Sequence, residues 1–202
     1  MFPRTLVVTL TLAAASTLAL AQEQPLKTIR EGALDRIELF VEQPPPAVSS
    51  MVTIKPFTTD AANLGTGVSG TKEQQQAART LRTEAPKELE AAFMKALASG
   101  GLFKGVVRDG TGDIVVEGSF TDMNPGSSVN KSDVLGERSV MAVSGTVRDG
   151  SGKLLARFEQ RRVASTRVLG ADAVGKMRQD ARNLGEDIAK FLKAWTSGKS
   201  LS

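Results

Sequence analysis

The chain has 202 residues, and 26 Lys and Arg against 22 Asp and Glu give it a formal charge of +4. It contains no His, no Cys and no Tyr. These absences exclude disulfides, thiol nucleophiles, Ser-His-Asp triads and ordinary zinc sites, and we expect no cofactor. The charge surplus is small and contains no Lys/Arg block, which argues against nucleic acid as a partner.

Residues 1–21 have the pattern of a cleaved export signal. Arg4 is the only charged residue before Glu23, an apolar run follows it, and Ala19-Leu20-Ala21 places small residues where a signal peptidase recognises them. The run is shorter than the roughly 20 apolar residues of a membrane-spanning helix. No later segment is long and apolar enough to cross a membrane. We therefore expect a periplasmic or secreted protein without a transmembrane segment after signal removal.

Residues 22–48 are predicted to be a loose N-terminal arm. Arg36 to Glu42 alternates like a short strand, and Pro44-Pro45-Pro46 follows as a stiff extended spacer. A better strand covers Met51 to Phe57, with Pro56 at its end or at an edge position. A single folded domain is expected over residues 49–196, followed by a flexible tail at 197–202.

Helical periodicity begins near Glu73, after a glycine-rich loop. Pro86 lies inside this stretch, so either one helix bends there or a second helix starts just before it. Gly100-Gly101 ends the helical stretch. An apolar stripe at helical spacing defines its buried side: Leu89, Ala92, Phe93, Ala96 and Leu97.

The sequence Val-Arg-Asp-Gly occurs twice, at residues 107–110 and 147–150, each time between β-rich runs. Asp-Gly between such runs is a strong signal for a tight hairpin. We therefore predict two hairpins, Phe103–Val107 with Asp113–Thr121, and Ser139–Arg148 with Lys153–Ser165. Two sets of alternating residues should each share one strand face: Ile114, Val116, Gly118 and Phe120, and Met141, Val143, Gly145 and Val147.

A final amphipathic helix is expected from about Ala171 to Trp195. The predicted fold class is α+β, with an antiparallel sheet of about five strands packed with two main helices. The order of elements is strand, helix, four strands, helix. The helices are expected either on one sheet face or on both.

Two glycine-rich motifs are similar to known sites but lack their context. Gly65 to Gly70 has the G-x-G-x-x-G spacing of dinucleotide binders, yet seven residues separate Phe57 from Gly65, which favours a flexible loop. Asp109-Gly110-Thr111 and Asp149-Gly150-Ser151 are similar to the paired motifs of aspartic proteases. The extra Gly breaks that match and favours hairpin turns.

The candidate partner contacts lie on the last strand and on one loop. Arg157, Arg161, Arg162 and Arg167, with Arg138 and Arg148 nearby, would form a basic patch for an anionic glycan, a lipid headgroup or a protein. The alternative is a solvated sheet edge that is protected by charge. The loop from Asn124 to Arg138 is the second candidate, because loops on a rigid scaffold usually carry function.

Two segments resemble a known family. They are DIVVEGSFTDMNPG at residues 113–126, and VSGTVRD at 143–149 followed by GKLLARF at 152–158. They resemble a family of bacterial envelope proteins, many of them lipoproteins, described only as a domain of unknown function. The resemblance covers about residues 51–195 and implies an envelope location, a sheet with helices and no catalytic residues. The chain departs from the pattern by lacking a lipobox Cys and by a shorter, more polar loop at residues 129–137.

These features predict a non-enzymatic envelope protein that binds a partner or assists assembly. The partner would be an envelope protein or an anionic envelope component, and the oligomeric state is left open. One alternative is a small-ligand carrier with a cleft between helix and sheet. A remote alternative is a carboxylate-based glycan hydrolase that uses Glu117 or Glu159.

Overall fold

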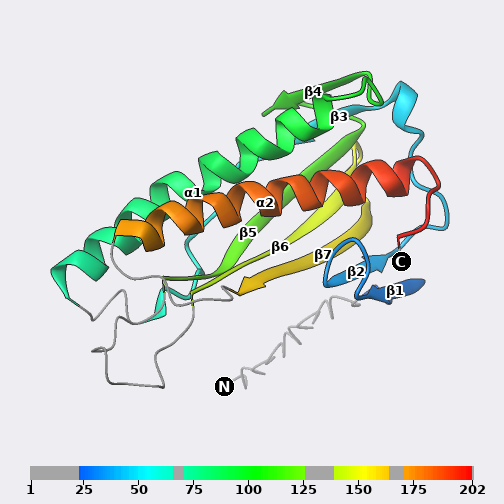
Figure 1. Ribbon diagram of the computed structural model, residues 1–202. Coiled ribbons are helices and arrows are strands. Elements are labelled where there is room, and N and C mark those ends of the chain that lie inside the picture. Colours follow the sequence, from blue (N-terminus) through cyan, green and yellow to red (C-terminus); the bar gives the residue numbers. More distant parts are fainter. Residues whose placement is uncertain (1–22, 66–70, 126–138, 164–170, 202) are drawn as a thin grey trace, which may run out of the picture.

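The computed structural model describes residues 23–65, 71–125, 139–163 and 171–201 (Figure 1). The predicted signal at residues 1–21 lies outside these ranges. The elements are β1 Lys27–Arg30, β2 Arg36–Leu39, a 3-10 turn at Ala47–Ser49, β3 Met51–Ile54, α1 Lys72–Ala98, β4 Gly105–Arg108, β5 Ile114–Asn124, β6 Val140–Asp149, β7 Leu154–Val163 and α2 Ala171–Thr196.

The described strands form one mixed sheet in the order β1-β2-β7-β6-β5-β3-β4. β3 runs parallel to β4 and to β5, and the remaining pairs are antiparallel. The α+β class is therefore confirmed, but the predicted antiparallel sheet of about five strands is wrong. The sheet has seven strands and contains both kinds of pairing.

The two additional strands, β1 and β2, come from residues 27–39. β2 pairs with β7, with Ile37 opposite Phe158 and Leu39 opposite Ala156. Ile37 and Leu39 are buried, and the pairing satisfies backbone groups on one side of β7 along residues 156–159. β7 is consequently an interior strand along its first half, and the outermost described strands are β1 and β4.

The first predicted hairpin is wrong in its pairing. β4 and β5 are joined by residues 109–113, where Asp109 and Gly110 have positive φ, but β3 lies between the two strands and pairs with both. The reason is the preceding connection: α1 returns the chain from the end of β3 to the start of β4, which makes these neighbours parallel. The second hairpin, β6 with β7, is confirmed.

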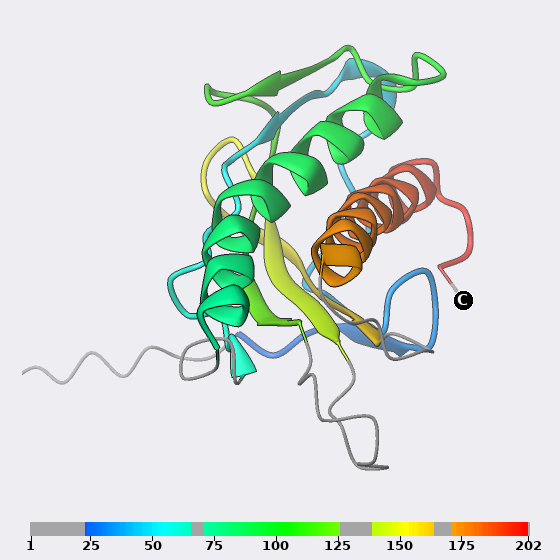
Figure 2. The same ribbon diagram turned by 60° about the vertical axis from the view of Figure 1, so that its left-hand side comes forward.

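Both helices cover the same face of the sheet and run side by side in the same direction (Figures 1 and 2). α1 is one helix with Pro86 inside it, and Figure 2 shows it bending along its length. Its start is defined by Thr71, whose hydroxyl accepts from the Gln74 amide while the Gln74 side chain accepts from the Thr71 amide.

α1 and α2 approach each other closely beside Gly185. A Cβ at this position would lie 2.3 Å from the Leu89 carbonyl oxygen and 3.0 Å from the Phe93 nitrogen of α1. Only glycine permits this backbone separation. Ion pairs between the helices flank the approach, because Arg178 and Arg182 of α2 both contact Glu88 of α1.

The core lies between the helices and one face of the sheet. The Phe158 ring of β7 meets Phe191 of α2 with ring centroids 6.3 Å apart. The paired glycines Gly118 and Gly145 make room for rings on this face, since a Cβ at either would lie 2.5 Å or less from Phe57 or Phe158 respectively. The two predicted sets of alternating residues in β5 and β6 share this helix-covered face, as their burial confirms.

The end of the chain folds back onto the β1–β2 turn. Leu201 is buried, and its carbonyl accepts a hydrogen bond from the Ala33 amide at 3.0 Å. The backbone of Leu201 passes so close to Gly32 that a side chain there would overlap it. Neither α1 nor α2, the helices of the described ranges, contains an apolar stretch long enough to span a bilayer.

Candidate functional site

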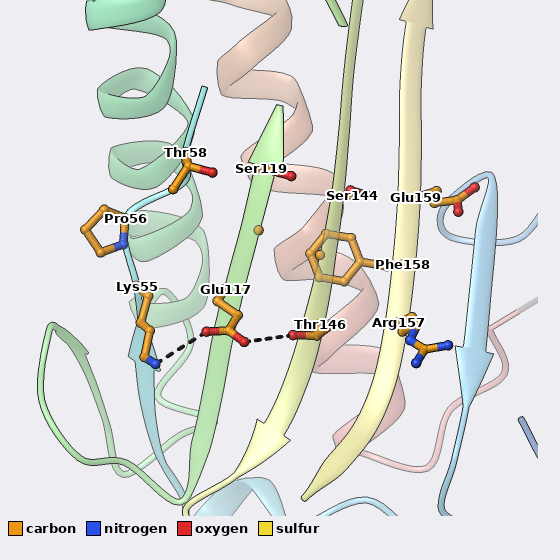
Figure 3. A pocket seen from close by; sticks show the side chains of 12 residues that line it. Lys55, Pro56, Thr58, Glu117, Ser119, Ser144, Thr146, Arg157, Phe158 and Glu159 are labelled. Atoms are coloured by element: carbon orange, nitrogen blue, oxygen red, sulfur yellow. Dashed lines mark hydrogen bonds and ion pairs between the residues drawn. The ribbon is translucent and has the colours of Figure 1, made fainter. Parts of the chain in front are cut away.

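The sheet face opposite the helices, which we call the open face, is hollowed by a shallow depression of about 700 Å3 (Figure 3). Side chains alternate between faces along a strand, so burial of the apolar set against the helices turns the polar set of the same strands outward. The polar residues of the open face come from five strands or their ends: Lys55 and Thr58, Glu117 and Ser119, Ser144, Thr146 and Arg148, Arg157 and Glu159, and Arg36 and Glu38.

One row of this face runs across the sheet through paired positions. Glu117 lies opposite Thr146, Thr146 opposite Arg157, and Arg157 opposite Glu38. Lys55 extends the row beyond Glu117, as Figure 3 shows. Each end of the row therefore holds a pair of opposite charges: Lys55 with Glu117 at one end, and Arg157 with Glu38 at the other. Thr146 lies between the two pairs.

Glu117 is the centre of the hydrogen bonds in this row. Its carboxylate accepts from the Lys55 ammonium at 3.3 Å, the Arg148 guanidinium at 3.2 Å and the Thr146 hydroxyl at 3.3 Å. Partial burial alone would raise the pKa of Glu117, but the bonds from Lys55, Arg148 and Thr146 outweigh it and lower the pKa below the ordinary value. Glu117 is accordingly held as a carboxylate, without a proton to donate.

The next row carries hydroxyl groups. Ser119 lies opposite Ser144, and Ser144 lies opposite Glu159. Thr58 forms an isolated bridge with Ser119 at the outer end. Among the described residues, no side chain forms a hydrogen bond with the hydroxyl of Ser119 or Ser144. The middle of the depression therefore presents small polar groups that are free to bond to something else.

At the β2 side of the open face, arginines and carboxylates alternate. Arg36 contacts Glu38 at 2.5 Å and Glu159 at 3.7 Å, and Arg157 approaches Glu38 at 3.7 Å. The guanidinium of Arg157 also lies 4.9 Å from the centre of the Phe40 ring. Because Arg157 already interacts with Glu38 and with the Phe40 ring, its charge is less available to bind a partner.

The structure separates the arginines that the sequence grouped together. Arg157 and Arg161 belong to the same strand face, whereas Arg162 faces the helices and forms an ion pair with Asp187 of α2. Arg138 and Arg167 lie outside the described residues. β2 pairs with residues 156–159 of β7, so the strand is not an edge at Arg157. No described strand pairs with that side of β7 at residues 160–163, so a charge-protected edge stays a prediction at Arg161 and Arg162.

Asn124, the other candidate contact, ends β5 opposite Val140. Its side chain is largely buried, and a Cβ on Gly65 would overlap it. Asn124 thus packs against the segment that follows β3. The rest of the proposed contact loop, residues 126–138, lies outside the described ranges, as does the glycine-rich motif from residue 66 onward.

Sequence reasoning did not identify Lys55, Thr146 or Ser144 as site residues. Alternation in β6 placed Met141 and Val147 inward, so the intervening Ser144 and Thr146 had to face outward, and this signal was available. Lys55 gave no such signal, since it reaches Glu117 only because β3 pairs with β5. Within the described part of the chain, no three carboxylates gather in a way that would hold a metal ion.

Solved structures of similar shape include protein XCC0632 from Xanthomonas campestris, with a TM-score of 0.47 and 12% identity over 79% of this chain and 95% of that one. The PelC dodecamer from Paraburkholderia phytofirmans gives a TM-score of 0.44 at 13% identity, over 76% and 96%. A minor lipoprotein from Acinetobacter baumannii gives 0.34 at 11% identity, over 73% and 93%.

No curated protein matches the sequence. A family model described as a domain of unknown function, DUF4410, matches residues 52–167, from β3 to beyond β7. This range includes the segments that carried the resemblance at residues 113–126 and 143–158. The matched range covers more than half of the chain, and the protein therefore belongs to the DUF4410 family.

Proposed function

We propose that this protein is a non-enzymatic binding protein of the bacterial envelope and that it takes up a partner on its open face. The observation that carries the proposal is the depression of about 700 Å3 over β5, β6 and β7, centred on the unbonded hydroxyls of Ser119 and Ser144. The export pattern of residues 1–21 supports the envelope location.

The shape of the site favours a protein segment as the partner. Pockets for small ligands bury most of the ligand surface, whereas this depression is shallow and spread over several strands. The face carries both signs of charge, including Lys55, Glu117 and Glu159, and such alternation gives specificity toward a partner with a complementary pattern. The layer between helices and sheet, where a carrier cleft was considered, is filled by buried side chains such as Phe93, Phe120 and Phe191.

The electrostatics of the open face argue against glycan hydrolysis. A general acid requires a raised pKa, whereas the donors around Glu117 lower its pKa. Glu117 and Glu159 are separated by β6 and by one row of the sheet, so their backbones are roughly 12 Å apart by standard strand spacings. These features support binding rather than catalysis.

The proposal is tested by filling the depression. Ser119→Trp places a large ring in the middle of the open face, and Gln76→Trp places the same ring on the exposed side of α1 as a matched control. Affinity capture from envelope extracts should recover a partner with the wild type and with Gln76→Trp, and should lose it with Ser119→Trp. Equal recovery with both variants, at unchanged far-UV circular dichroism, would remove the open face from the account.

A further inference from the structure

The exposed side of α1 carries cations that form no ion pair with any described residue. α1 contains five cations, which we call the basic stripe: Lys72, Arg79, Arg82, Lys87 and Lys95. All of them are exposed, and none has an ion-pair partner among the described residues. Carboxylates three or four residues from a cation on a helix would stabilise it as ion pairs, so the lack of such pairs here needs an explanation.

The explanation is that most of the carboxylates of α1 are turned inward. Glu84 and Glu88 contact Arg178 and Arg182 of α2. Glu90 is buried, accepts from the Phe57 amide at 3.0 Å and pairs with Arg108 of β4 at 2.8 Å. Of the four carboxylates in the helix, only Glu73 is exposed. A nearly neutral helix sequence therefore presents a strongly basic outer surface.

The neighbouring part of α2 continues this surface. A second hollow, of about 540 Å3, lies between the helices. Its charged lining has four cations, Lys95, Arg182, Lys190 and Lys193, against two carboxylates, Glu88 and Glu186. Lys190 is largely exposed and pairs with Asp187 at 3.2 Å, and Lys193 donates to the Ser99 carbonyl at the end of α1 at 2.7 Å. The hollow thus sits where the basic stripe meets the lysines of α2.

From this arrangement we propose that the basic stripe is a contact surface for the anionic surface of a lipid bilayer. At 1.5 Å per residue, Lys72 and Lys95 lie roughly 35 Å apart along the helix, too far to share one small anion. Charges spread in this way match a continuous negative surface, which attracts each nearby Lys or Arg. The stripe lies on the opposite side of the sheet from the open face, so a partner and a bilayer would be bound at the same time.

The test is vesicle co-sedimentation with the chain that begins at Gln22, which retains every described element and omits the apolar run of the predicted signal. Phosphatidylglycerol vesicles are compared with neutral phosphatidylcholine vesicles. The triple variant Arg79→Gln, Lys87→Gln, Lys95→Gln removes three of the five cations of the stripe. The matched control Lys27→Gln, Lys153→Gln, Lys199→Gln removes the same charge from exposed sites elsewhere on the chain.

We expect binding to anionic vesicles only, falling with added salt. Each removed cation should weaken binding about fivefold, so the stripe variant should bind roughly a hundredfold more weakly, with a much smaller loss for the control. Equal binding to neutral vesicles, no binding to either, or equal losses in the two triple variants would overturn the proposal. So would binding to polyglutamate without binding to vesicles, which would indicate an acidic protein instead. None of these results depends on the open face. Failure of the vesicle test would therefore leave the proposed function untouched, and failure of the capture experiment would leave the membrane contact untouched.

Discussion

Replacement of Gly185 by alanine tests how α1 and α2 are packed over the sheet. The added Cβ would lie 2.3 Å from the Leu89 carbonyl oxygen and 3.0 Å from the Phe93 nitrogen. These are backbone atoms, which no side-chain rotation moves out of the way. The two helices would have to separate, and the buried contacts of Leu89 and Phe93 on either side would loosen with them.

The same helix supplies a matched control. Gly175 has no atom within 4 Å of the position of an added Cβ, so Gly175→Ala should stabilise α2 by about 1 kcal/mol through helix propensity alone. At Gly185 an equal gain is opposed by overpacking, which typically costs about 1–3 kcal/mol. Because backbone atoms receive the overlap, we expect the upper part of that range, about 2–3 kcal/mol between the two variants.

Urea unfolding followed by far-UV circular dichroism measures this difference directly. Gly175→Ala should unfold at a higher urea concentration than the wild type, and Gly185→Ala at a lower one, with similar slopes. Thermal unfolding should separate the two variants by roughly 5–10 °C in Tm. If Gly185→Ala were as stable as Gly175→Ala, the close approach of α1 and α2 at this point would be refuted.

Two further predictions concern other parts of the fold. Hydrogen bonds from Arg178 and Arg182 lower the pKa of Glu88 below its ordinary value of 4.5. The folded state is therefore stabilised by the charged Glu88 above that pH, and this stabilisation is lost as the pH falls through the lowered native pKa. Glu88→Gln should therefore cost about 1–2 kcal/mol at neutral pH and flatten the loss of stability in acid, which urea titrations across pH will check. Deleting Leu201 and Ser202 should cost about 1–3 kcal/mol by exposing the β1–β2 turn, and an unchanged Tm would contradict the docking of Leu201 on Ala33.

Local pattern predicted the elements better than their arrangement. The hairpin of β6 and β7 and the span of α2 follow from turn chemistry and periodicity, which involve neighbouring residues only. The pairing of β3 with β5 joins residues about 60 positions apart, such as Val52 and Ile114, and no short-range signal encodes it. The same applies to β2, whose alternation was visible while its partner β7 was not.

The candidate site depends on this long-range order. The alternation of polar and apolar residues places Glu117 and Arg157 on polar strand faces, and the sequence alone predicts this placement. Their connection to Lys55 and Glu38 requires the positions of β3 and β2 in the sheet. Arg162 shows the opposite case: it is adjacent to Arg161 in sequence, yet the pleat sends its side chain to Asp187 on the other face.

The central claim is that the open face, rather than the helix layer, meets the protein partner. A photoreactive residue at Ser144, in the middle of the depression, and another at Gln76, on the exposed side of α1, would be compared by cross-linking in intact cells. We predict a discrete protein adduct from position 144 and none from position 76. An adduct from position 76 with none from position 144 would contradict the assignment.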